Sequence, residues 1–316
     1  MSKKYDIVTA MDLCVDFLVQ LGNVVPEFGQ KEQLVEDYTI ELGGSCSIFA
    51  CQAAKLGLKI AGLGAVGDDF FGRLIRDKLD SAGVITDYIR IDRSVKTGMG
   101  AALCKRDGDR SILTYAGSIE AAGIEDMTDE ILASTKHLHI GSFYLLKKLE
   151  KNLLEIVRTA KKYGATISLD TNWDPYETWD GGIFDLLPLV DIFQPNENEI
   201  MAITRKNNLE EAVKSILELV PVITLKRGKK GAAVITREKY FHVEPVDVPV
   251  VDTVGAGDSF DAGFLYGFLS ELDLFECLKI GSICGSLNTR MAGGIAGQPL
   301  RTEMEQILRK ERSNGK

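Results

Sequence analysis

The sequence predicts an α/β fold in which helices cover both faces of a mostly parallel β-sheet. Short apolar runs typical of strands alternate with helical segments along most of the chain, and no low-complexity linker interrupts them. Glycine follows several of the helical segments directly, where it is a common stop signal. Because parallel strands need crossover helices, the alternation indicates strand–helix–strand units in a single domain that spans residues 1–316.

Each predicted element has a local signal. Strands are expected at Asp6–Val8, Tyr38–Leu42, Thr166–Asp170, Ile192–Gln194, Val222–Leu225 and Ala232–Thr236, and another apolar run that ends near Val251 indicates the end of a strand. Helices are expected at Ser45–Leu56, Asp69–Ala82, Lys151–Tyr163, Leu209–Leu219, Asp258–Leu269 and Leu274–Arg290. Ligands of such folds bind beyond the carboxyl ends of the strands, so the loops 170–173, 194–196 and 252–258 should share one rim.

Two stretches break the alternation. Residues 5–41 hold strand-like runs without a convincing long helix, and residues 98–115 indicate a hairpin with a turn at 107–109. We interpret parts of both as a small sheet that projects from the main domain. A projecting sheet beside a ligand rim is a candidate lid. The lid is also the surface through which we expect a homodimer to form.

Composition limits the classes of partner. The chain is 45% hydrophobic and 26% charged, and its net charge of -9 argues against a nucleic-acid partner. No apolar stretch approaches the roughly 20 residues that span a bilayer, and no signal peptide precedes the first strand, so we expect a cytoplasmic protein without a membrane partner. The six cysteines form no C-x-x-C pair, which favours free thiols in a reducing compartment.

A glycine-rich turn before an apolar helix is the strongest functional signal. The backbone N–H groups of Gly255, Ala256 and Gly257 can converge on an anion at a helix N-terminus, and Asp258 places a carboxylate there. This combination suits phosphoryl transfer, because amides hold the transferring group while the acid accepts a proton from the attacking hydroxyl. We expect the helix N-terminus to keep Asp258 ionised. The competing interpretation is an N-cap Asp after a glycine turn.

Two other features concern a ligand on the same side of the sheet. Gly43 and Gly44, between a predicted strand and helix, would let a ligand approach the backbone closely, or they make an ordinary turn. Asp16 stands inside an apolar run. It is either an outward-facing strand residue or a carboxylate that accepts two hydroxyl hydrogen bonds, as sugar-binding carboxylates do.

Two more segments could contact a nucleotide. Asn196-x-x-Glu199 resembles a capping box, and in the functional interpretation Glu199 lies near a hydrated Mg²⁺. The segment from Lys226 to Gly231, which includes Gly228, joins two apolar strands. Its cations could meet nucleotide phosphates, or it is a solvated basic hairpin.

The spacing Gly62-x-Gly64-x-x-Gly67 matches a dinucleotide-binding fingerprint and follows a short predicted strand. Asp68 and Asp69 come next, at the helix N-terminus where a pyrophosphate would sit, and two carboxylates would repel it. A dinucleotide-dependent oxidoreductase is therefore an alternative that the sequence argues against.

Together these motifs resemble the PfkB family of carbohydrate kinases, over nearly the whole chain. The resemblance rests on Gly43-Gly44, the segment 64–72 (GAVGDDFFG), Asn196-x-x-Glu199 and Asp252-Thr253-x-Gly255-Ala256-Gly257-Asp258, in family order. It implies a ribokinase-like three-layer α/β/α sandwich with a small β-sheet lid. The implied activity is ATP-dependent phosphorylation of a primary hydroxyl of a small sugar or sugar acid, with Mg²⁺.

The resemblance also implies a role for each site residue. Asp258 would be the catalytic base and Gly255, Ala256 and Gly257 the anion hole, while Asp16, Gly43 and Gly44 hold the sugar. Asn196 and Glu199 belong to the Mg–phosphate region, Lys226, Gly228 and Gly231 lie beside ATP, and Ser282 borders the adenine. Asp252 would bind a monovalent cation such as K⁺.

Departures from the family pattern leave the substrate open. Ribokinases usually carry Asn at the positions of Cys14 and Ile48, and Lys226-Arg227-Gly228 looks more like 2-keto-3-deoxygluconate kinases. A nucleoside kinase of the same fold is the nearest alternative. A sugar-binding regulator without turnover is another, and the intact Asp258 motif argues against it.

Overall fold

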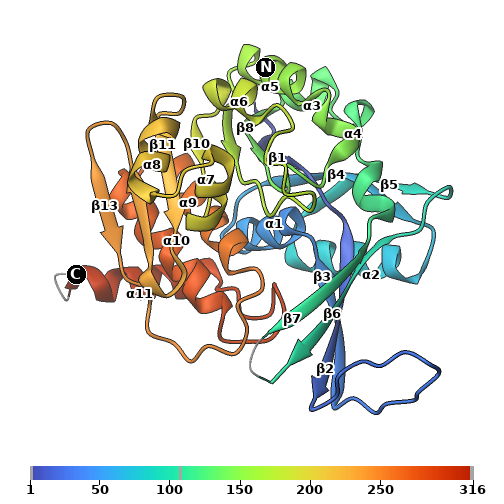
Figure 1. The fold of residues 1–316 in the computed structure, drawn as a ribbon. Coiled ribbons are helices and arrows are strands. Elements are labelled where there is room, and N and C mark those ends of the chain that lie inside the picture. Colours follow the sequence, from blue (N-terminus) through green and yellow to red (C-terminus); the bar gives the residue numbers. More distant parts are fainter. Residues whose placement is uncertain (1–2, 107–108, 314–316) are drawn as a thin grey trace.

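The computed structural model describes residues 3–106 and 109–313 (Figure 1). Within this part of the chain, a nine-stranded sheet has the order β13-β12-β11-β10-β9-β8-β1-β4-β5. Its strands are β1 (Tyr5–Ala10), β4 (Ile60–Gly67), β5 (Ile85–Asp92), β8 (Thr135–Ile140), β9 (Thr166–Leu169), β10 (Ile192–Phe193), β11 (Val222–Lys226), β12 (Ala232–Ile235) and β13 (Tyr240–Val243). Strand β12 pairs antiparallel with both β11 and β13, and the other pairs of this sheet are parallel, so the mostly parallel sheet is confirmed.

Helices cover both faces of this sheet and give the expected three layers (Figure 1). One buried cluster joins the sheet to α3 (Asp129–Ala133), α5 (Leu153–Lys162), α6 (Ile183–Leu186), α7 (Glu197–Thr204) and α8 (Leu209–Leu217). The other joins it to α1 (Ser45–Lys55), α2 (Phe70–Ala82), α9 (Ala256–Leu269) and α10 (Leu274–Asn288). Helix α11 (Arg301–Ser313) packs on α10, and α4 (Lys147–Glu150) is a single short turn.

A second, small sheet projects from the domain where the candidate lid was expected, and we refer to it as the lid (Figure 1). It contains β2 (Cys14–Gly22), β3 (Asp37–Gly43), β6 (Gly98–Lys105) and β7 (Arg110–Tyr115), in the order β3-β2-β6-β7. Strands β6 and β7 form the predicted antiparallel hairpin, with Met99 opposite Tyr115. Asp107 and Gly108 of the predicted turn lie outside the described residues.

The GAVGDDFFG segment joins the lid to the main domain. The Asp69 side chain caps α2 by accepting a hydrogen bond from the Gly72 amide at 2.8 Å. The same carboxylate accepts from the amide and hydroxyl of Thr97, one residue before β6, at 2.9 and 2.7 Å. A Cβ on Gly72 would lie 2.2 Å from the Gly67 carbonyl oxygen, so the close contact requires glycine. Asp69 therefore has a structural role at the base of the lid.

The structure corrects some expectations about local structure and excludes one alternative. The apolar run that ends near Val251 is not a strand, because residues 244–252 follow β13 without sheet pairing. Glycines Gly62 to Gly67 lie inside the buried strand β4 and form no turn at a helix N-terminus, which removes the dinucleotide interpretation. The helix expected from Lys151 begins at Leu153.

Helix α9 also begins earlier than predicted. Gly255 is its N-cap with φ 75°, and Asp258 lies in the first turn, so the N-cap interpretation of Asp258 was wrong. Among the described residues, no helix is long and apolar enough to cross a membrane. All six cysteines are free thiols, as predicted.

Candidate active site

The predicted rim exists at the carboxyl ends of the parallel strands. Asp170, directly after β9, and Lys226, the last residue of β11, form an ion pair at 2.9 Å. Gln194, after β10, donates a hydrogen bond of 3.0 Å to Asp261 in α9. These contacts join the loops after β9 and β10 to Lys226 and α9, and Gly257 of the third loop lies against the Lys226 side chain, so the three predicted loops share one rim.

The glycine turn before Asp258 depends on the absence of side chains. Gly255 has a left-handed φ of 75°, and a Cβ there would lie 2.7 Å from the Gly294 carbonyl oxygen and 2.8 Å from Cγ2 of Ile48. A Cβ on Gly257 would meet the stem and Nζ of Lys226 at 3.6 Å. The first N–H groups of α9, including that of Gly257, have no acceptor within the helix and can serve an anion.

Burial opposes the ionisation of Asp258 that its place at the helix N-terminus favours. Burial raises the pKa of Asp258 to about 8, and the nearby charge of Asp170 raises it further, while Lys226 opposes the shift. The favourable effect of the helix N-terminus does not outweigh this desolvation. A carboxyl whose pKa lies near the working pH can accept a proton efficiently in the reaction, which suits a general base.

The predicted sugar-binding residues are adjacent. A Cβ on Gly43 would lie 2.6 Å from Oδ1 of Asp16, and one on Gly100 of β6 would lie 3.0 Å from the same atom. Gly44 caps α1 with φ 85°, where a Cβ would lie 2.2 Å from the Asp12 carbonyl oxygen. Asp16 is partly exposed, and burial followed by the charge of Asp12 raises its pKa to about 6. The glycines therefore leave the Asp16 carboxyl free of side chains on both flanks.

Lys226 has a different environment from the one predicted. Its ammonium lies 2.9 Å from Asp170 and 2.9 Å from Asp261, whose side chains are 5% and 1% exposed. Burial raises the pKa of Asp261, whereas Lys226 outweighs burial at Asp170 and holds that pKa below its ordinary value. Asp170 was expected at the rim without a role of its own, and Asp261 was not predicted. The available signal was that each stands near the end of a strand or the start of a helix at the predicted rim.

The remaining predicted nucleotide contacts have structural partners as well. Asn196 and Glu199 form a reciprocal capping box with bonds of 2.9 and 2.8 Å, and burial followed by Asp170 raises the pKa of Glu199 to about 7. Arg227 and Lys230 both pair with Glu197. Gly228 and Gly231 have φ values of 55° and 76°, so the turn requires them. Basic charge in this turn is thus partly neutralised within the protein.

The last two predicted residues anchor loops. Asp252 accepts hydrogen bonds of 3.0 Å from the amides of Val254 and Gly293, and it ties the loop before α9 to the segment after α10. Ser282 of α10 donates to the Glu244 carbonyl at 3.2 Å.

The donor set at the rim fits a hydrated Mg²⁺. No group of three or more His, Cys, Asp or Glu side chains is arranged to hold a metal directly in the described part of the chain. Glu199 supplies a carboxylate, and Oδ1 of Asp170 is buried without a hydrogen-bond partner among the described residues. Hard oxygen donors of this kind bind Mg²⁺ that retains several waters.

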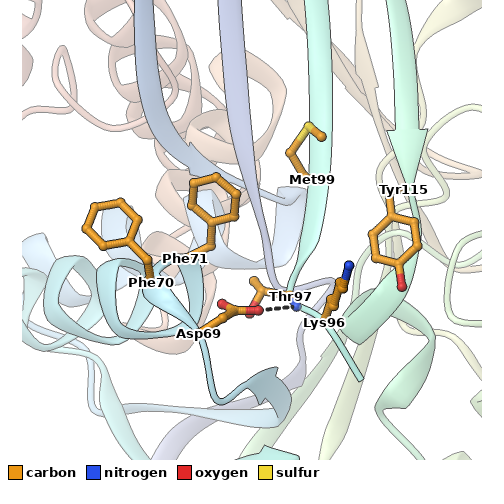
Figure 2. A pocket seen from close by; sticks show the side chains of 7 residues that line it. All are labelled: Asp69, Phe70, Phe71, Lys96, Thr97, Met99 and Tyr115. Atoms are coloured by element: carbon orange, nitrogen blue, oxygen red, sulfur yellow. Dashed lines mark hydrogen bonds between the residues drawn. The ribbon is translucent and has the colours of Figure 1, made fainter. Parts of the chain in front are cut away.

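A separate pocket lies at the base of the lid (Figure 2). It measures about 450 Å³ and is lined by Asp69, Phe70, Phe71, Lys96, Thr97, Met99 and Tyr115. Met99 is next to Gly100, which pairs with Asp16, and successive residues of a strand point to opposite faces. The pocket is therefore on the face of the lid that turns away from Asp16.

Comparisons with known proteins agree with the fold and show the family. Residues 9–301 match the model of the pfkB family of carbohydrate kinases. The chain is 31% identical to an ATP-dependent ribose-1-phosphate kinase of Halopiger xanaduensis, over 79% of this chain and 81% of that protein. The chain belongs to the pfkB family of carbohydrate kinases.

Solved structures of similar proteins have the same fold. Arabidopsis thaliana ribokinase with ribose and ATP superposes with a TM-score of 0.83 at 25% identity, covering 98% of this chain and 99% of that chain. A candidate ribokinase II from E. coli in complex with ATP and Mg²⁺ has a TM-score of 0.85 at 25% identity, covering 98% and 100%. This chain has the ribokinase-like fold, and it is an ATP-dependent sugar kinase.

Proposed function

We propose that the enzyme transfers the γ-phosphoryl group of ATP to a primary hydroxyl of a small sugar or sugar acid, with Asp258 as the general base. The observation that carries the proposal is the position of Asp258 in the first turn of α9, beside the glycine turn Gly255–Gly257. The bond between the γ-phosphorus and the bridging oxygen of ADP breaks, the sugar oxygen bonds to phosphorus, and the hydroxyl proton passes to Asp258.

The amides of Gly255, Ala256 and Gly257 would bind the transferring phosphoryl group, and that of Ala256 would turn from the Thr253 carbonyl, to which it donates at 3.3 Å. Charge develops on its oxygens during transfer, and donors fixed by the backbone stabilise that charge without reorganising. Lys226 supports this role because its ammonium flanks Gly257. It would add positive potential near the phosphates, with Asp170 and Asp261 holding it in place.

Divalent and monovalent cations complete the proposed site. Bound Mg²⁺ shields the phosphate charge, and Glu199 and Asn196 would hold it through water. Asp252 would help to bind K⁺ beside the turn that precedes α9. Ser282, Gly228 and Gly231 would border the nucleotide.

The sugar would bind between Asp16, Gly43, Gly44 and Asp258. Cys14 and Ile48 are buried, and Ile48 packs against Gly255 and Gly294, so neither position offers the polar side chain that a ribose contact would use. This favours a substrate other than ribose. A coupled ADP-release assay over pentoses, hexoses, keto-deoxy sugar acids and nucleosides tests the proposal. Turnover of a sugar or sugar acid supports it, and turnover of nucleosides alone would replace it with the nucleoside kinase.

We also propose that a second copy of the chain packs on the lid face that turns away from Asp16. Tyr38, Leu113 and Tyr115 share that face and are 61%, 63% and 50% exposed. Burying exposed apolar area is the main driving force of association. Sedimentation should show a dimer that Leu113→Lys dissociates, and a monomeric wild-type protein would refute the proposal.

A further inference from the structure

The lid face that carries Asp16 also carries an arginine, Arg110. Asp16 of β2 is opposite Gly100 of β6, and Gly100 is opposite Thr114 of β7. Alternate residues of a strand lie on the same face of a sheet, so Cys104 of β6 and its partner Arg110 at the start of β7 belong to this face too. Arg110 is exposed. Its guanidinium is therefore accessible on the side of the lid that carries the proposed sugar-binding carboxyl.

Arg110 differs from the other basic residues at the outer end of the lid, because it has no ion-pair partner within residues 3–106 and 109–313. Lys105, the last residue of β6, pairs with Asp109 at 2.8 Å. Arg106 follows β6 and pairs with Glu36. The protein itself neutralises these neighbouring basic side chains, whereas the charge of Arg110 is left for a ligand.

A series of close contacts runs from the turn before Asp258 to the lid. Gly255, in that turn, is so close to α1 that a Cβ would lie 2.8 Å from Cγ2 of Ile48. Just before α1, a Cβ on Gly43 would lie 2.6 Å from Oδ1 of Asp16. The start of α9, the first turn of α1 and the base of the lid are therefore neighbours in this order.

Arg110 extends this order toward the outer end of the lid. Thr114, which is level with Asp16 in the sheet, is four residues from Arg110 along β7, or about 13 Å at about 3.3 Å per residue. The long arginine side chain shortens this gap when it points back toward Asp16. Burial and the charge of Asp12 raise the pKa of Asp16, and the charge of Arg110 opposes the rise, as expected for a cation on the same side of the lid. An acceptor that extends from Asp258 past Asp16 therefore has its far end toward Arg110.

The chemistry of the groups along this series distinguishes classes of acceptor. Asp12, Asp16 and Asp258 supply carboxyls, which suit the hydroxyl groups of any sugar. A neutral sugar offers no charge for Arg110 to neutralise. A carboxylate or a phosphate does, because the planar guanidinium presents parallel N–H donors that match two oxygens of either group. The position of Arg110 therefore favours an acceptor with an anionic end.

We propose that Arg110 binds an anionic group at the end of the acceptor remote from the phosphorylated hydroxyl. The substrate is then a sugar acid or a phosphorylated sugar that retains a free primary hydroxyl, and not a neutral sugar. This inference rests on the proposed function, because it takes the reacting hydroxyl to lie at Asp258. Closure of the lid would bring Arg110 onto the anionic group.

Steady-state kinetics in the ADP-release assay test the inference. The panel of acceptors gains sugar 1-phosphates beside the keto-deoxy sugar acids, so that its arms separate phosphate from carboxylate. The best acceptor should be an anion from one of these two arms. Arg110→Gln should raise KM for that acceptor by about tenfold to a hundredfold, since a charged donor is lost, and leave KM for ATP unchanged. Arg106→Gln is the matched control, because Arg106 already pairs with Glu36, and both KM values should stay the same.

Neutral counterparts separate a contact with the anion from a structural effect on the lid. The counterpart is the amide of the acid or the methyl glycoside of the sugar 1-phosphate. In the wild type, kcat/KM should be about tenfold to a hundredfold higher for the anion than for its neutral counterpart. Arg110→Gln should remove this preference and leave kcat/KM for the neutral counterpart unchanged, and Arg110→Lys, which keeps the charge without the planar fork, should recover part of it. An equal loss on both acceptors would mean that the substitution disturbs the lid itself, and it would overturn the inference.

The outcomes distinguish this inference from the proposed function. If the best acceptor is a neutral sugar, or if Arg110→Gln has an unchanged KM for an anionic acceptor, the inference is wrong while sugar phosphorylation stands. If only nucleosides are turned over, or if Asp258→Asn is fully active, the proposed function itself fails, and the inference fails with it.

Discussion

Replacing Lys226 with methionine tests how the buried charges beneath the anion hole are balanced. Methionine keeps the apolar stem but removes the ammonium that lies 2.9 Å from both Asp170 and Asp261. Removing one partner of a buried ion pair typically costs about 3–5 kcal/mol, because the remaining charge is uncompensated. Since total stability is typically about 5–15 kcal/mol, Lys226→Met should lose a large part of its free energy of unfolding.

The loss should depend on pH. In the wild type, Lys226 holds the folded pKa of Asp170 below its unfolded value, so this stabilisation is present above the unfolded pKa and is lost as the pH falls. In the variant, burial without a cation raises the pKa values of both carboxyls, and their ionisation then destabilises the fold as the pH rises. The stability difference between wild type and variant should therefore be larger at pH 8 than at pH 5.

Urea unfolding followed by circular dichroism at the two pH values measures this difference. Lys229→Met is the matched control, because Lys229 is exposed in the same turn and its replacement should change stability by no more than about 0.5 kcal/mol. If Lys226→Met is as stable as Lys229→Met, or if its loss is the same at pH 5 and pH 8, the description of the charge cluster is wrong.

Three further predictions concern the sugar, the cations and the lid. Asp16→Ala should raise KM for the sugar by about tenfold to a hundredfold and KM for ATP far less, since a charged acceptor is lost; an unchanged sugar KM in steady-state kinetics would place the sugar elsewhere. Turnover should stop in EDTA, and full activity in EDTA would show that no divalent cation is needed. Turnover should also increase with K⁺, and equal rates in Na⁺, K⁺ and large organic cations would show that no monovalent cation binds specifically. Hydrogen exchange in β6 and β7 should slow at saturating sugar, because a closed lid excludes water, and unchanged exchange would argue against a lid.

Much of the fold could be predicted from local patterns. The glycine stops after helices and the alternation of apolar runs predicted the layers, and the hairpin of β6 and β7 followed from two strand-like runs around a turn signal. Helix starts were less accurate where glycine obscures the boundary, as at Gly255. The run before Val251 shows a further limit, because apolar residues without a neighbouring strand remain an extended loop.

The candidate site was predicted in its motifs but not in its interactions. One cluster joins Asp170, Lys226 and Asp261, which come from three different elements. Another contact joins Asp12 to Ser142, which is 130 residues away in the sequence. No local spacing in the sequence predicts either of them. The pKa of Asp258 is raised by burial and by charges from distant parts of the sequence, and its place at a helix N-terminus does not reveal either. Lys226 likewise has the residue type of a phosphate contact, and only the fold reveals its two carboxylate partners.

The most direct test of the central claim is the pH dependence of kcat/KM for the true substrate, in the wild type and in Asp258→Asn. The wild-type rate should fall as the pH drops below about 8, because burial raises the pKa of Asp258 to about 8 and only the ionised carboxylate accepts a proton. Asn at this position keeps the size of the side chain and leaves the anion-hole amides in place. Asp258→Asn should therefore bind ATP normally and lose about 10²–10⁴-fold in kcat. Its kcat/KM should not fall as the pH drops below about 8. A folded Asp258→Asn enzyme with near-normal kcat and an unchanged pH profile would contradict the account.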